Sequence, residues 1–144
     1  MANNSNSWLG YPYPITKGPK GFFGAQSGTD QIKSDLLILL LTSPGERVAL
    51  PDFGTPLKDL IFEPGDASLV TRAKQMIIDS IKKWEPRIAV DQINVSLGAP
   101  SSILNKNDDL TEKNAILNIN IQFRDPDVLT ESQSLVLDVP LPGG

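Results

Sequence analysis

The sequence predicts an α+β fold, in which two to three helices pack on one face of a small antiparallel sheet of three to four strands. Two observations lead to this prediction. Apolar residues recur at helical spacing up to residue 84, whereas after residue 87 they alternate with polar residues over three short runs. Alternation of this kind is typical of an antiparallel sheet that helices cover on one side and water on the other.

Three segments have the pattern of helices. Ser27 and Asp66 are the expected N-caps of two of them, and Thr55 is the expected N-cap of a shorter one that has Pro56 at its first position. Pro86 prevents the last helix from continuing. The expected bounds are residues 28–41, 56–62 and 67–84.

Three strands follow, and their buried faces are expected to be formed by Ile, Leu, Val and Phe side chains. A further short edge strand is expected around Tyr11–Ile15, because proline is tolerated at sheet edges. Several aromatic residues surround that segment, so we expect it to pack on the domain. The three main strands are expected at residues 88–97, 114–124 and 134–139, with a polar loop at 98–112.

The 144 residues fit one domain with a modest hydrophobic core. We expect a disordered leader at residues 1–10 and a single domain at residues 11–144. The polar start has no basic segment followed by an apolar one. The longest apolar run, Leu36–Leu41, is far shorter than the ~20 residues that span a bilayer. We therefore expect a protein that is made and kept in a cytosol and has no membrane partner.

Composition argues against several kinds of function. The net charge is −4 and no more than two basic residues are adjacent, so we expect no nucleic-acid partner. The chain has no cysteine and no histidine, which removes thiolate nucleophiles, the commonest general base and the commonest metal ligand. Any enzyme built on this chain would therefore have to use carboxylate, lysine, tyrosine or serine side chains.

The tripeptide Glu85-Pro86-Arg87 stands where the last helix ends and the first clear strand begins. Pro86 pushes Glu85 out of helical geometry and makes the backbone rigid. One interpretation is a helix stop with an exposed ion pair that contributes at most ~1 kcal/mol. The other is a docking corner, in which Glu85 and Arg87 are held ready for a partner and Arg87 binds a partner carboxylate through two hydrogen bonds.

A second charged turn contains Glu46 and Arg47 after the turn residue Gly45. These two residues are candidates for partner binding. The favoured alternative is a brace, in which Arg47 forms an ion pair with Glu85 or Glu63 and so holds the two charged turns together. The nearby segment 51–54, Pro-Asp-Phe-Gly, is interpreted as a turn that anchors its phenylalanine in the core.

These segments together are similar to those of a known family. The string LLTSPGER…PDFGTPL…LIFEP…KKWEPRI resembles, in order and spacing, the baseplate wedge and sheath-initiator family of contractile tails. That family includes the small tail protein of contractile phages historically labelled a lysozyme, and the related baseplate component of type VI secretion systems. The resemblance runs from about Gly10 to the last strand, and the 98–112 loop has no recognisable motif.

The resemblance implies a structural baseplate wedge component of a contractile phage tail, which docks into the wedge core and templates sheath polymerisation. The implied partners are other baseplate wedge proteins, the tail tube, and tail sheath subunits that add a strand to an open sheet edge. Which strand forms that edge stays open, as does protection of the edge by residues 11–15. The implied location is the virion tail baseplate, with assembly in the host cytoplasm. The expected partner-binding residues are Glu85, Pro86, Arg87, Glu46 and Arg47.

Two other functions stay open. A peptidoglycan-cleaving tail lysozyme needs two carboxylates ~5–10 Å apart, and Glu46, Glu63 and Glu85 are available. However, an adjacent arginine lowers the pKa of a carboxyl group, which is the opposite of what a general acid needs. We therefore predict that the chain is not an enzyme and has no catalytic residue. Because a structural protein acts by binding alone, we also predict no cofactor and no metal. The equivalent baseplate protein of a secretion or injection machine would use the same surfaces as the phage protein.

Overall fold

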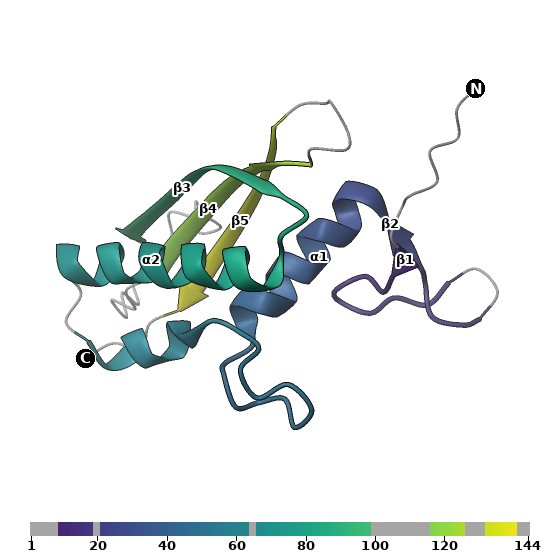
Figure 1. Cartoon of the computed structure of the whole chain (residues 1–144), viewed down its shortest axis with the longest axis horizontal. Coiled ribbons are helices and arrows are strands. Elements are labelled where there is room, and N and C mark those ends of the chain that lie inside the picture. Colours follow the sequence, from purple (N-terminus) through teal and green to yellow (C-terminus); the bar gives the residue numbers. More distant parts are fainter. Residues whose placement is uncertain (1–8, 19–20, 64–65, 99–115, 126–131, 141–144) are drawn as a thin grey trace, which may run out of the picture.

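The computed structural model describes residues 9–18, 21–63, 66–98, 116–125 and 132–140 (Figure 1). It confirms the α+β class, because two α-helices lie against a three-stranded antiparallel sheet of order β3-β4-β5. A separate two-stranded sheet pairs β1 with β2. The described elements are β1 (Leu9–Gly10), β2 (Gln26–Ser27), α1 (Gly28–Leu41), the 3-10 helix η1 (Pro56–Phe62), α2 (Ala67–Trp84), β3 (Ala89–Gly98), β4 (Ile116–Arg124) and β5 (Gln133–Pro140).

The helices lie where the sequence predicts them, but their caps differ. Asp66 caps α2 as expected, since its carboxylate accepts hydrogen bonds from two first-turn amides at 2.9 and 3.0 Å. The predicted N-cap positions of Ser27 and Thr55, at α1 and η1 respectively, are confirmed, but a capping hydrogen bond from their side chains is not.

The core lies between the helices and the inner face of the sheet. Ile93, Ile121 and Leu135 align across the three strands and are all buried. Phe123 is also fully buried on β4, the central strand. The helices cover this face with side chains at helical spacing, as the sequence predicts. Their buried apolar residues are Ile32, Leu36, Leu39, Leu40, Leu69, Ala73, Ile77 and Ile81.

The N-terminal segment differs from the prediction. Residues 9–18 and 21–27, which we call the arm, form a ribbon attached to the start of α1 (Figure 1). Leu9 and Gly10, assigned above to the leader, form β1 in this ribbon. The edge strand expected at Tyr11–Ile15 is absent from the described structure, and these residues pair with neither edge of the three-stranded sheet. Pro12 and Pro14 lack the N–H groups that such pairing needs.

The arm contacts the domain as predicted, but its aromatic side chains do not form that contact. Tyr11, Phe22 and Phe23 are all strongly exposed, and none of them belongs to the hydrophobic core. The arm is held to α1 by polar contacts instead. Residues 1–8 of the predicted leader, and the predicted loop at 98–112 apart from Gly98, lie outside the described residues.

Truncating Phe123 to alanine should lower the free energy of unfolding by about 3–5 kcal/mol, because the surrounding core can only partly collapse into the space left behind. Urea denaturation followed by circular dichroism measures the change. The matched control is Val48→Ala, at a fully exposed side chain, which should change stability by less than about 0.5 kcal/mol. Equal and small losses in the two variants would contradict the central position of Phe123.

Candidate docking site

The corner, Glu85-Pro86-Arg87, connects the end of α2 to the start of β3. Glu85 is the C-cap of α2, and its amide donates the last hydrogen bond of the helix to the Ile81 carbonyl at 2.8 Å. Its backbone has already left the helical region, with φ −127° and ψ 64°. The ring of Pro86 causes this departure, since a residue before proline is disfavoured in the helical conformation. The chain therefore turns sharply at a defined residue.

Arg87 forms the central interaction of the site. Its guanidinium donates two hydrogen bonds to the Glu85 carboxylate, from Nε at 2.5 Å and from Nη2 at 2.6 Å. Nη2 also donates to Asp35 Oδ2 on α1 at 2.7 Å. The hydrogen bonds with Glu85 are the main reason why the pKa of Arg87 is raised above its ordinary value; burial opposes the increase and Asp35 adds to it. Arg87 thus ties α1 to the turn between α2 and β3.

The ion pair at the corner is not an exposed one. The Glu85 residue is only 5 % exposed, and the side chains of Arg87 and Asp35 are 29 % and 31 % exposed. Asp35 is itself held in place by a hydrogen bond from Gln31 Nε2 to Oδ1 at 2.7 Å. Arg87 and Glu85 are joined by two hydrogen bonds and Glu85 is buried, so this ion pair has a defined geometry, unlike most ion pairs at a protein surface.

Arg47 does not pair with Glu85 or Glu63, so the predicted brace is wrong. Glu85 is taken by Arg87, and Glu63 pairs with Arg72. The Arg47 guanidinium instead lies over the ring of Phe53, 4.0 Å from its centroid. That position is a cation–π contact at an exposed site. Arg47 is therefore held beside the corner by an aromatic ring rather than by a carboxylate.

The loop between α1 and η1 positions Phe53 and Arg47. Gly54 has φ +123°, and a Cβ at this position would overlap the carbonyl of Thr42, so only glycine fits here without strain. The Thr55 amide donates to the same carbonyl at 2.9 Å, which closes the loop at its base. Phe53 then meets the ring of Trp84 edge to face, with centroids 5.3 Å apart. The predicted turn and aromatic anchor are confirmed, although Phe53 lies at the edge of the core.

These elements enclose a hollow of about 240 Å³, which we call the corner pocket. Three of the five predicted partner-binding residues, Glu85, Arg87 and Arg47, line it together. Pro86 is exposed next to them in the chain. The pocket combines aliphatic and aromatic walls with charged groups, so it could accept an apolar side chain with a carboxylate nearby. Its lining residues are Asp35, Ile38, Leu39, Arg47, Phe53, Trp84, Glu85 and Arg87.

Glu46, the fifth predicted residue, is not brought into the pocket. Its carboxylate pairs with Lys58 on η1 at 2.5 Å, and both side chains are about half exposed. The hydrogen bond from Lys58, followed by one from the Ser43 amide, lowers the pKa of Glu46 below its ordinary value. Glu46 therefore stabilises the loop rather than the corner.

Sequence reasoning missed Asp35, which completes the network. One signal was available, because Asp35 is a carboxylate next to the apolar run of α1 and follows Gln31 by one helical turn. Within the described residues, no group of three or more acidic, histidine or cysteine side chains could hold a metal ion. None of the described helices is long and apolar enough to cross a membrane.

Comparison with known families identifies the chain. The model of the family described as "Baseplate wedge protein gp25" matches residues 26–124, more than half of the sequence and every residue of the corner pocket. The chain belongs to this family. It is therefore a baseplate wedge-like protein of contractile phage-tail-like machines, located in the tail baseplate, where it assembles with other baseplate proteins. Members of this family are structural components of the baseplate.

Two solved structures share the fold of this wedge protein, and a third is less similar. A candidate tail lysozyme from Geobacter sulfurreducens has a TM-score of 0.66 and 25 % identity, over 82 % of this chain and 95 % of that one. A chain of the anti-feeding prophage baseplate has a TM-score of 0.59 and 17 % identity, over 92 % and 84 %. A chain of the post-contraction pyocin R2 baseplate has a TM-score of 0.49 and 17 % identity, over 88 % and 97 %. The comparison with curated proteins found no match.

Replacing Arg87 by alanine should destabilise the wedge protein by about 1–3 kcal/mol, because it leaves the buried Glu85 carboxylate without its partner. Arg87→Lys should recover only part of this loss, since an ammonium group cannot reproduce the two-pronged geometry. Chemical denaturation of both variants measures the difference. If Arg87→Ala were as stable as the wild type, the network would not hold the corner together.

Proposed function

We propose that this wedge protein docks into the wedge core through its corner and templates the polymerisation of the tail sheath. The observation that supports the first part is the corner pocket, where a largely buried ion-pair network forms one wall and an exposed arginine lies beside it. A rigid pocket of this kind loses little conformational entropy when a partner binds.

The corner residues have different roles in this proposal. Glu85 is buried and bonded to Arg87, so it positions Arg87 rather than meeting a partner directly. Arg47 is exposed and has no ion pair with any described residue, so it is the group suited to bind a partner carboxylate. Exposed Pro86 and the half-buried part of Arg87 complete the contact surface. The expected partner is a wedge protein that places an apolar side chain in the pocket and a carboxylate on Arg47.

The second surface is an edge of the three-stranded sheet. Strand β3 and strand β5 are its two edges. The register of β3 shifts between Val90 and Gln92, and Arg124 of β4 holds Asp91 at this irregular point through hydrogen bonds of 2.6–2.9 Å. Such irregularities protect an edge against strand addition. Strand β5 pairs without a shift over eight residues, so we take β5 as the edge that accepts a strand from a sheath subunit.

We further propose that the protein is not an enzyme, although one structural neighbour is a candidate tail lysozyme. Each of the three carboxylates considered for glycan cleavage is bonded to a cation: Glu46 to Lys58, Glu63 to Arg72 and Glu85 to Arg87. Glycan hydrolysis needs two carboxyl groups that flank and contact the scissile bond, and each of these three is instead engaged by a cation of the same chain.

The same proposal includes assembly in the host cytoplasm and the tail tube as a further partner in a phage tail. A secretion or injection machine would use the same two surfaces.

Reversing the charge of Arg47 should prevent incorporation of the protein into baseplates, since Arg47→Glu repels the expected partner carboxylate and leaves the core untouched. Particles purified from producing cells would contain at least tenfold less of this variant than of the wild type by quantitative immunoblot. Lys74→Glu is the matched control, because it makes the same charge change at an exposed position on α2. Equal incorporation of both variants at matched thermal stability would overturn docking through the corner.

The choice between β3 and β5 can be tested with substitutions at two residues that pair with the same residue of the central strand. Asn94 on β3 and Val136 on β5 flank Asn120 of β4 in register, and both are exposed. Lysine on an edge strand opposes strand addition, so Val136→Lys should give baseplates without sheath, whereas Asn94→Lys should give normal tails. Negative-stain electron microscopy counts sheathed tails. Sheath loss with Asn94→Lys alone would move the site to β3, and normal tails from both variants would contradict templating by a sheet edge.

A further inference from the structure

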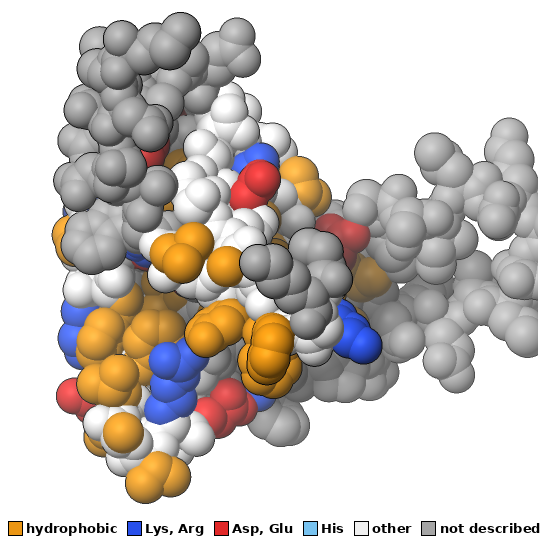
Figure 2. All heavy atoms as spheres, turned by 90° about the vertical axis from the view of Figure 1, so that its right-hand side faces the viewer, with side chains coloured by type: hydrophobic (Ala, Val, Ile, Leu, Met, Phe, Trp, Pro, Cys, Tyr) orange, Lys and Arg blue, Asp and Glu red, His pale blue; other side chains and the backbone are white. Residues whose placement is uncertain are grey.

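The arm presents an apolar surface that no described residue covers. Its large apolar side chains are 44–81 % exposed and lie outside the core. Figure 2, seen from the side on which the arm lies, shows hydrophobic side chains gathered over this end of the molecule. Contiguous apolar surface of this kind marks an interaction site. The residues are Leu9, Tyr11, Tyr13, Ile15, Phe22 and Phe23.

The arm has a defined, hydrogen-bonded structure. Backbone hydrogen bonds join Gly24 to Thr16 at 2.7 Å and Gly18 to Phe22 at 2.6 Å, and β1 pairs with β2 at the base. Ser34 of α1 fastens the ribbon to the domain. Its Oγ accepts from the Tyr13 amide at 3.2 Å and donates to the Gln26 side chain at 3.0 Å. The apolar side chains are therefore held in position before a partner arrives, which lowers the entropic cost of binding.

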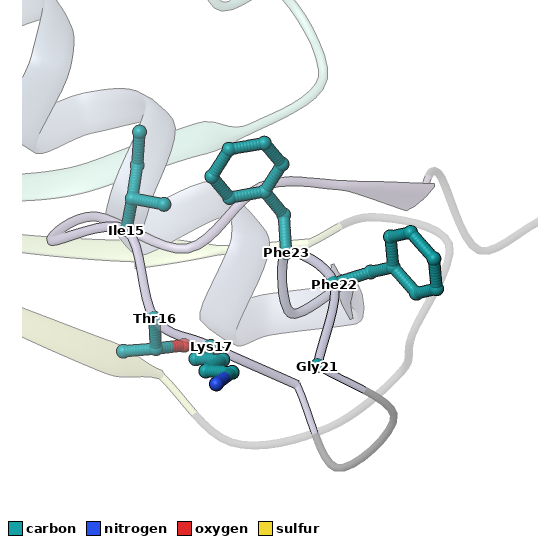
Figure 3. A pocket seen from close by; sticks show the side chains of 6 residues that line it. All are labelled: Ile15, Thr16, Lys17, Gly21, Phe22 and Phe23. Atoms are coloured by element: carbon teal, nitrogen blue, oxygen red, sulfur yellow. The ribbon is translucent and has the colours of Figure 1, made fainter.

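The ribbon surrounds a hollow of about 420 Å³ near its tip. In Figure 3, Ile15 and Phe23 point the same way, while the ring of Phe22 points outward in a different direction. Phe23 also meets Tyr11 edge to face, with ring centroids 6.1 Å apart. This arrangement places an outward-pointing ring next to a hollow with apolar walls, which suits insertion of the arm between apolar side chains of another protein.

The charge of the arm indicates the chemistry of its partner. The first 29 residues contain two lysines and no acidic residue, whereas all 17 acidic residues follow. Lys17 lines the hollow, is exposed, and pairs with no described carboxylate. An apolar surface with a single sign of charge is complementary to an apolar surface that carries the opposite charge.

We propose that the arm binds an apolar groove with carboxylates at its rim on a neighbouring baseplate protein. This inference rests on the proposed function, because it takes the baseplate as the place of binding. A second copy of this chain is a poorer acceptor, since a contact between two arms would place lysines against lysines and offer no carboxylate. A lipid surface is also disfavoured, because it would call for a cluster of basic residues. The arm is thus a contact separate from the corner.

The test places a photo-crosslinking benzoylphenylalanine at position 22 of the full chain in producing cells. We expect a cross-link to one baseplate protein, mapped by mass spectrometry to an apolar segment that contains Asp or Glu. Lys17→Glu should lower the cross-link yield at least fivefold. The same probe at position 74, an exposed site on α2, is the control for chance contacts. Cross-links only to a second copy, only to lipid, or no more frequent than at position 74 would overturn the inference.

A second variant separates failure of this inference from failure of the proposed function. Phe22→Ser combined with Phe23→Ser should keep the thermal stability of the wild type, because neither ring is in the core. This variant should still enter baseplates through the corner, but with at least tenfold weaker retention in a high-salt wash. Absence of the wild-type protein from baseplates would overturn the proposed function. If the double variant stayed in the baseplate through the high-salt wash as well as the wild type does, only the arm contact would be overturned.

Discussion

The three-way contact of Arg87 with Glu85 and Asp35 sets the geometry of the site. It joins a helix from the start of the domain to the turn that leads into the sheet, across 52 positions of the sequence. Because Glu85 is buried, its charge must be matched within the fold, and Arg87 provides the match in a defined orientation. The corner pocket follows from this arrangement, since the fastened Arg87 forms one wall and Phe53 on Trp84 forms another.

Much of the fold was predictable because its local signals agree with one another. α2 has a capping aspartate, a clear helical period and a terminating proline, and its bounds are those predicted. The strands were also found, since strict alternation leaves little choice of face. The arm was not predicted correctly, because aromatic residues normally indicate burial and nothing local shows that this ribbon lacks a surface to cover.

The candidate site was only partly predictable for a similar reason. Glu85, Pro86 and Arg87 stand together in the sequence, so their proximity needed no tertiary information. Asp35 and Arg47 are brought to them by packing and by a loop that closes on Gly54, which sequence spacing does not reveal. The partner of Arg47 was therefore assigned incorrectly, although Arg47 does line the pocket beside the corner. Charges close in sequence are easier to pair from sequence than charges brought together by loops.

The most direct test of docking through the corner is a cryo-electron microscopy map of the assembled baseplate at side-chain resolution. We expect the corner pocket to be covered by another wedge protein, with an apolar side chain inside it and a carboxylate on Arg47. A map in which this protein is present but its corner pocket faces solvent would show that it does not dock through the corner.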